Sequence, residues 1–124
     1  MEKIHKEILG LMGKIDIDCR DERDIIIDLK GQMDVYNSND VQKLIEAYVQ
    51  RGFIKFILNL KQVTDLDSST ISVFTTCLRG LEKKEGKLML AGLQGPPKEV
   101  FKMAKLTDVF ERYPDVMSAT EKQL

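Results

Sequence analysis

A nearly continuous apolar segment, Phe53 to Leu60, constrains the fold of this chain more than any other feature. Lys55 and Asn59 alone interrupt it. Strands that read as almost unbroken apolar runs are typical of sheets covered on both faces, and strands of that kind are usually connected through helices. The segment therefore predicts an α/β fold in which helices alternate with strands and cover the sheet.

Helical periodicity flanks this segment on both sides. Each flank places apolar residues three and four positions apart, which puts them on one face of a helix. The first helix is expected to begin at Asn37 to Asn39, because these residue types favour helix starts, and to end at Gly52. The first stripe comprises Val41, Leu44, Ile45, Tyr48 and Val49, and the second comprises Ile71, Phe74, Leu78 and Leu81.

Further strands and helices complete the expected order. Residues 15–19 alternate apolar and polar side chains and residues 25–29 are mostly apolar, so the two segments predict an antiparallel hairpin. Residues 87–91 predict another strand, Pro96 and Pro97 open a third helix, and residues 116–124 predict a last one. The result is an α/β domain with a mixed four- to five-stranded sheet. Its carboxyl-terminal core is expected to contain Val100, Phe101, Met103, Ala104, Leu106, Val109 and Phe110.

Composition narrows the class of protein. The chain has 124 residues and is 43% hydrophobic, enough for one domain with a sizeable core. Its formal net charge of -1 makes nucleic acid an unfavourable main ligand, and no segment approaches the roughly 20 apolar residues of a membrane span. Cys19 and Cys77 are expected to be buried thiols. The first residues lack the apolar core of a signal peptide, so we expect a cytoplasmic protein.

Asp67, Ser68 and Ser69 form the candidate functional site, because they lie between an expected strand and an expected helix. Asp67 or Ser68 could cap the helix through a side-chain oxygen. Alternatively, Ser68 could accept a phosphoryl group, because the free N–H groups at a helix start favour a phosphate by roughly 0.3–1 kcal/mol. The second interpretation makes the chain a switched binding module rather than a catalyst.

Acidic residues around Ser68 give such a switch its physical basis. Asp65 and Asp67 flank the serine, and Asp34 is expected at the same end of the sheet. A phosphate adds about -1.5 to -2 charge. Two like charges about 6 Å apart repel by on the order of 3 kcal/mol at an effective dielectric near 20, which is roughly a hundredfold in affinity. Phosphate could therefore block the docking of an acidic partner without unfolding the domain.

The residue pattern gives little support to a metal site or a catalytic site. Asp65 and Asp67 have no evident third ligand for a metal ion. His5, the sole histidine, has no visible catalytic partner. Neither an acid–base pair nor a nucleophile–base pair is apparent, so we expect no enzyme activity, no metal and no cofactor. Met33 is a candidate for a binding surface.

The order of these motifs resembles the STAS domain family of anti-sigma factor antagonists. The resemblance rests on Leu58-Asn59-Leu60 followed by Asp67-Ser68-Ser69, and on Gly31-Gln32-Met33-Asp34 after the second strand. Residues 87–92 and the stretch from Val100 to Phe110 also match. It covers residues 13–124 as a STAS domain and leaves residues 1–12 as an amino-terminal extension.

The resemblance implies a mechanism. The unphosphorylated protein would bind an anti-sigma factor that is also a serine kinase, and so free a sigma factor. Phosphorylation of Ser68, with Ser69 as a minor acceptor, would release the complex, and a metal-dependent serine phosphatase would reverse the reaction. ATP and Mg²⁺ would belong to the kinase, and neither nucleic acid nor membrane would be a direct partner. The residues expected to contact the partner are Met33, Asp34, Asp67, Ser69 and Thr70.

One departure and two alternatives accompany this resemblance. Many family members have glycine where this chain has Thr70 and Ser72, and the two hydroxyls are potential competing acceptors. The alternatives are a structural STAS subunit of a larger signalling assembly, and a STAS module that binds a nucleotide or another small ligand.

Overall fold

The computed structural model describes residues 15–19 and 24–122, so the expected extension at residues 1–12 lies outside the described residues. Within these ranges, five strands form one sheet in the order β1 to β5. β1 is antiparallel to β2, and the remaining pairs are parallel, which confirms the expected hairpin and mixed α/β sheet. The elements are β1 (Ile15–Cys19), β2 (Asp24–Met33), α2 (Val35–Val49), β3 (Lys55–Leu66), α3 (Ser68–Glu82), β4 (Lys87–Ala91), α4 (Gly95–Met103), β5 (Glu111–Tyr113) and α5 (Val116–Lys122).

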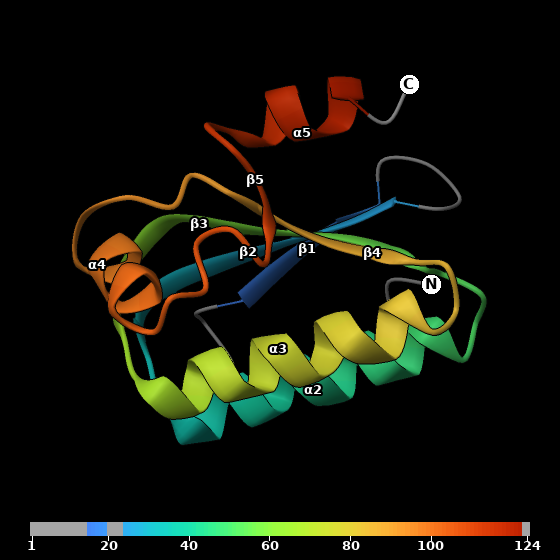
Figure 1. Ribbon diagram of the computed structural model, residues 1–124. Coiled ribbons are helices and arrows are strands. Elements are labelled where there is room, and N and C mark those ends of the chain that lie inside the picture. Colours follow the sequence, from blue (N-terminus) through green and yellow to red (C-terminus); the bar gives the residue numbers. More distant parts are fainter. Residues whose placement is uncertain (1–14, 20–23, 123–124) are drawn as a thin grey trace.

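Helices cover both faces of the sheet. Figure 1 shows α2 and α3 side by side on one face, α5 on the other face, and α4 at one end of the sheet. Because successive side chains of a strand point to opposite faces, Phe56 and Leu58 of β3 pack toward the core under α2 and α3, whereas Ile57 packs with Ala119 of α5. The apolar segment from Phe53 to Leu60 is therefore covered on both sides, as predicted.

Phe101 closes the end of the larger core. Its ring makes an edge-to-face contact with Phe110, with ring centroids 5.6 Å apart. Met103 and Ala104, which were expected in the core, are instead exposed, Met103 by 81%. Met103 lies two residues after Phe101, about 200° around the helix, and so faces solvent. The expectation for Val109 was also wrong, because this residue is 48% exposed in the turn where Phe110 takes the inward position.

β5 is a strand that the sequence pattern did not reveal. It has three residues, and Glu111 and Arg112 are both exposed, so no apolar alternation marks it. Its pairing with β4, Leu90 opposite Arg112, identifies it. Cys77 is buried as expected, whereas the side chain of Cys19 lies outside the described part of the chain. Within the described residues, no helix is long and apolar enough to cross a membrane.

Gly86 allows the start of β4 to approach the start of β3. The N–H of Lys87 donates to the carbonyl oxygen of Ile54 at 2.8 Å, and a Cβ atom on Gly86 would overlap that same oxygen. We expect Gly86→Ala to lower the free energy of unfolding by about 1–3 kcal/mol, because the backbone would have to shift. Urea unfolding at neutral pH measures the change.

Gly80 supplies the matched control for this substitution. It lies inside α3, and a Cβ atom there would meet nothing within 4 Å. Gly80→Ala should therefore raise the free energy of unfolding by up to about 1 kcal/mol, because alanine favours the helix. Equal effects of the two substitutions would contradict the close approach at Gly86.

Candidate functional site

The candidate site lies where two neighbouring parallel strands end and two helices begin. Met33 of β2 pairs with Leu66 of β3 at the last position of their ladder. The next residues in each strand, Asp34 and Asp67, are the N-caps of α2 and α3. Because the strands end in register, the amino-terminal ends of the two helices come together at one edge of the sheet (Figure 1).

Asp34 caps α2 through a reciprocal pair of hydrogen bonds. Its Oδ1 accepts from the backbone N–H of Tyr36 at 2.9 Å and of Asn37 at 3.1 Å, while the N–H of Asp34 donates to Oδ1 of Asn37 at 2.7 Å. The Asn37 amide also donates to the carbonyl of Gln32 at 3.0 Å. The expected helix start at Asn37 to Asn39 was therefore wrong: α2 begins at Val35, and Asn37 completes the cap.

Asp67 caps α3, which decides between the two capping candidates. Its Oδ1 accepts from the Ser69 hydroxyl at 2.6 Å, from the Thr70 N–H at 3.0 Å and from the Thr70 hydroxyl at 3.1 Å. The hydrogen bond from the Ser69 hydroxyl, followed by that from the Thr70 N–H, lowers the pKa of Asp67 below its usual value of 3.8. Asp67 therefore stays negatively charged beside Ser68 at neutral pH.

Ser68 is exposed at the first position of α3. It lies next to the N–H groups of the first helical turn, where the helix dipole is positive. Ser69 is half-buried, and its hydroxyl donates a hydrogen bond to Asp67. Of the two expected acceptors, Ser68 is therefore the more accessible one.

Met33 and Thr70 do not lie on the surface. Their exposed fractions are 1% and 0%. Both residues belong to the site by position, but burial leaves neither side chain available for direct contact with a docked protein. The Thr70 hydroxyl donates a hydrogen bond to Asp67, which also removes this hydroxyl as a competing acceptor of phosphate. Ser72, two residues after Thr70 in α3, is exposed.

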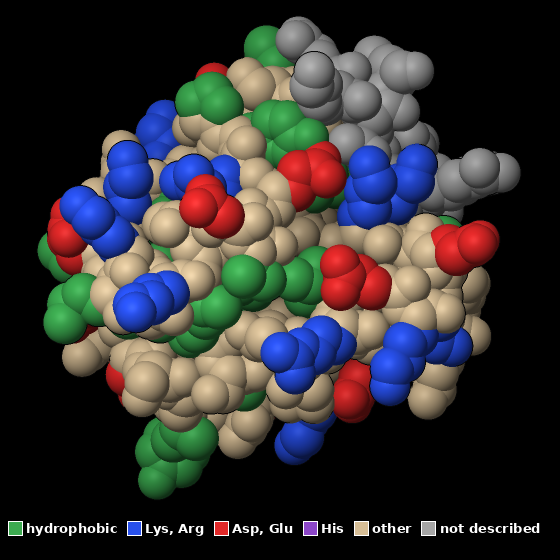
Figure 2. All heavy atoms as spheres, viewed as in Figure 1, with side chains coloured by type: hydrophobic (Ala, Val, Ile, Leu, Met, Phe, Trp, Pro, Cys, Tyr) green, Lys and Arg blue, Asp and Glu red, His purple; other side chains and the backbone are tan. Residues whose placement is uncertain are grey.

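Val35 and Tyr36 were missed as possible contact residues. They occupy the first turn of α2, directly after Asp34, and are 43% and 79% exposed. Figure 2 shows hydrophobic side chains projecting at the start of α2. The signal was available in the sequence, since both residues lie off the apolar stripe of α2 and yet are apolar or aromatic. The site therefore combines two fixed carboxylates, one accessible hydroxyl and an exposed apolar pair.

This geometry suits the docking of another protein under the control of charge. The carboxylates of Asp34 and Asp67 are held in place by the helix starts that they cap. Asp65, the second-to-last residue of β3, adds an exposed acid whose Oδ1 accepts from the N–H of Leu66 at 2.9 Å. A phosphate on Ser68 would concentrate further negative charge at this edge.

Comparisons with known proteins match most of the chain. A family model described as the STAS domain matches residues 14–119. A curated relative, the anti-sigma-B factor antagonist of Listeria monocytogenes, is 29% identical over 97 residues, which cover 78% of this chain and 85% of the relative. The anti-sigma factor antagonist SpoIIAA in its unphosphorylated form has a TM-score of 0.78 at 19% identity, covering 87% of this chain and 94% of SpoIIAA. The phosphorylated form of SpoIIAA from Bacillus has a TM-score of 0.73 at 18% identity, covering 89% and 99%.

Substitution of Asp67 tests the cap. We expect Asp67→Ala to lower the free energy of unfolding by about 1 kcal/mol at pH 7, because α3 loses its N-cap. Asp67→Asn should cost less, since asparagine keeps a capping oxygen. Urea unfolding at pH 7 compares the three proteins.

The pH dependence of the same variants isolates the charge. The folded state lowers the pKa of Asp67, so its ionised form stabilises the fold above pH 3.8, and this contribution is lost as the pH falls through the lowered pKa. Asp67→Asn should show a shallower loss of stability on acidification between about pH 5 and pH 2. Identical slopes in the wild type and Asp67→Asn would refute the assignment.

Proposed function

The chain belongs to the STAS domain family, and we propose that it acts as an anti-sigma factor antagonist switched by phosphate on Ser68. Its unphosphorylated form binds an anti-sigma factor that is also a serine kinase, and the bound sigma factor is released. The kinase transfers a phosphoryl group from ATP, held with Mg²⁺ on the kinase, to Ser68 and the complex separates. A serine phosphatase restores the active form.

The position of Ser68 carries this proposal. The hydroxyl belongs to an exposed residue at the positive end of α3, and two acidic N-caps, Asp34 and Asp67, lie at the same edge of the sheet. The name of the Listeria monocytogenes relative and the two forms of SpoIIAA, unphosphorylated and phosphorylated, support the same function.

The modification can act without unfolding the domain. Ser68 is exposed, and its phosphate would lie at the positive end of α3. The docked partner experiences the opposite effect, because any carboxylate that it presents near Ser68 meets a cluster that is already acidic. Each such contact loses roughly a hundredfold in affinity by the repulsion of like charges.

The charge on Ser68 should control binding but not folding. We expect Ser68→Asp to weaken binding to the host's anti-sigma factor kinase by at least about tenfold, because it places a permanent negative charge at the docking edge. The melting temperature should stay within a few degrees of the wild type. Calorimetry of binding and thermal unfolding measure the two quantities.

Ser68→Ala and Ser72→Ala are the paired controls. With ATP and the kinase, mass spectrometry should find one added phosphate on the wild type and on Ser72→Ala, and none on Ser68→Ala. Ser68→Ala should remain bound to the kinase after ATP is added. Phosphate on Ser68→Ala, or unfolding of Ser68→Asp, would overturn the proposal.

Tyr36 is the expected anchor of the docked partner. Its ring is 79% exposed beside the acidic caps, and tyrosine is among the residues that most often dominate binding energy. We expect Tyr36→Ala to weaken binding of the kinase by about tenfold or more without a change in stability. Met103→Ala, at a similarly exposed residue of α4, is the matched control and should bind as the wild type does.

A further inference from the structure

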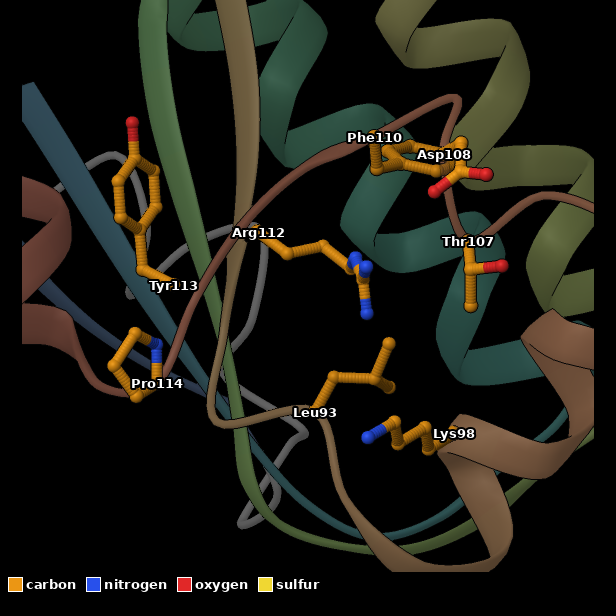
Figure 3. Close-up of a pocket in the computed structure, with 8 residues that line it drawn as sticks. All are labelled: Leu93, Lys98, Thr107, Asp108, Phe110, Arg112, Tyr113 and Pro114. Atoms are coloured by element: carbon orange, nitrogen blue, oxygen red, sulfur yellow. The ribbon is translucent and has the colours of Figure 1, made fainter.

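A groove of about 510 Å³ lies between α4, the connection from α4 to β5, and β5 itself. This volume falls within the range of about 300–1,000 Å³ that is typical of small-molecule sites. None of its residues belongs to α2 or α3, so it is separate from the Ser68 site. The lining residues are Leu93, Lys98, Thr107, Asp108, Phe110, Arg112, Tyr113 and Pro114 (Figure 3).

Two cations from different elements converge on this groove. Figure 3 shows the guanidinium of Arg112, from β5, and the amine of Lys98, from α4, reaching toward the same space with Leu93 between them. Within the described residues, neither cation has a hydrogen bond or an ion pair. Lys and Arg side chains also gather over α4 in Figure 2. With Asp108 also in the lining, the groove carries two positive charges and one negative charge, on a protein whose net charge is -1.

The nearest acid on β5 does not neutralise this charge. Glu111 precedes Arg112, and neighbouring residues of a strand point to opposite sides. Its carboxylate lies 3.9 Å from the amine of Lys87 and accepts a hydrogen bond from the hydroxyl of Tyr113. Glu111 is therefore engaged away from the guanidinium of Arg112.

An apolar surface accompanies the two cations. Phe110 is buried and held against Phe101 by the edge-to-face contact, so its position is fixed. Leu93 is half-buried and lies between the cations in Figure 3. Asp108 also lines the groove and would repel an anion placed beside it, so an anionic group is favoured on the side of Lys98 and Arg112.

We propose that this groove binds a small organic phosphate. A phosphate dianion matches two converging cations, and the planar guanidinium of Arg112 can donate two parallel hydrogen bonds to it. The carbon part of the ligand packs against Leu93. The proposal does not depend on the phosphorylation of Ser68.

Phenyl phosphate is the test ligand, because it joins a phosphate to an apolar ring. Calorimetry at low salt should show saturable binding with one site, and amide NMR shifts should lie at residues 93, 98 and 107–113. Inorganic phosphate and benzoate should bind at least about tenfold more weakly, since each lacks one half of the recognised chemistry, and phenol should not bind. Equal affinity for phenyl phosphate and benzoate, or shifts confined to the starts of α2 and α3, would overturn the proposal.

Charge-removing variants identify the cations that hold the phosphate. Arg112→Gln and Lys98→Gln should each weaken phenyl phosphate binding by at least about tenfold, because a charge-assisted hydrogen bond is lost. Lys102→Gln, at an exposed residue of α4 outside the groove, should bind as the wild type does. Ser68→Ala should also bind normally, which separates this site from the phosphorylation switch. Unchanged affinity in Arg112→Gln, or an equal loss in Lys102→Gln, would refute the site.

Discussion

The parallel pairing of β2 with β3 is the interaction on which the rest of this structure depends. The ladder carries both strands to the same edge and ends with Met33 opposite Leu66. Both residues are buried, so the apolar core itself sets the point at which the chain leaves the sheet. Asp34 and Asp67 then start two helices side by side. A shift of the ladder by one residue would turn one strand over relative to the other and displace one helix start from its neighbour.

Much of the fold follows from apolar patterning. The run from Phe53 to Leu60 and the stripes of α2 and α3 predict their elements because burial on fixed faces leaves a clear period in the sequence. The pattern fails where burial does not impose a period. β5 has two exposed residues among three, and its pairing comes from neighbouring β4. Met103 is apolar but exposed on the short helix α4, where Phe101 takes the buried position. Val109 is exposed in a turn, where Phe110 takes the buried position.

The candidate site was predictable in position but not in detail. An acid before a helix start is a local signal, so Asp67 and Ser68 could be identified from the sequence. Which residue caps depends on the backbone conformation that the preceding strand imposes, and so does the earlier start of α2 at Val35. The burial of Met33 and Thr70 comes from packing between the two helix starts and the sheet, which no local pattern encodes. The exposure of Tyr36, by contrast, could have been predicted, because this residue lies off the apolar stripe of α2.

The brevity of β5 has a consequence for self-association. An outermost strand offers unpaired backbone groups to which another chain can add, and long, flat and apolar outermost strands invite uncontrolled polymerisation. Here that strand is three residues long, and Glu111 and Arg112 place opposite charges on its exposed side chains. Such a strand is a poor template for a foreign chain. The domain can therefore be abundant in a cell without joining end to end through this side of its sheet.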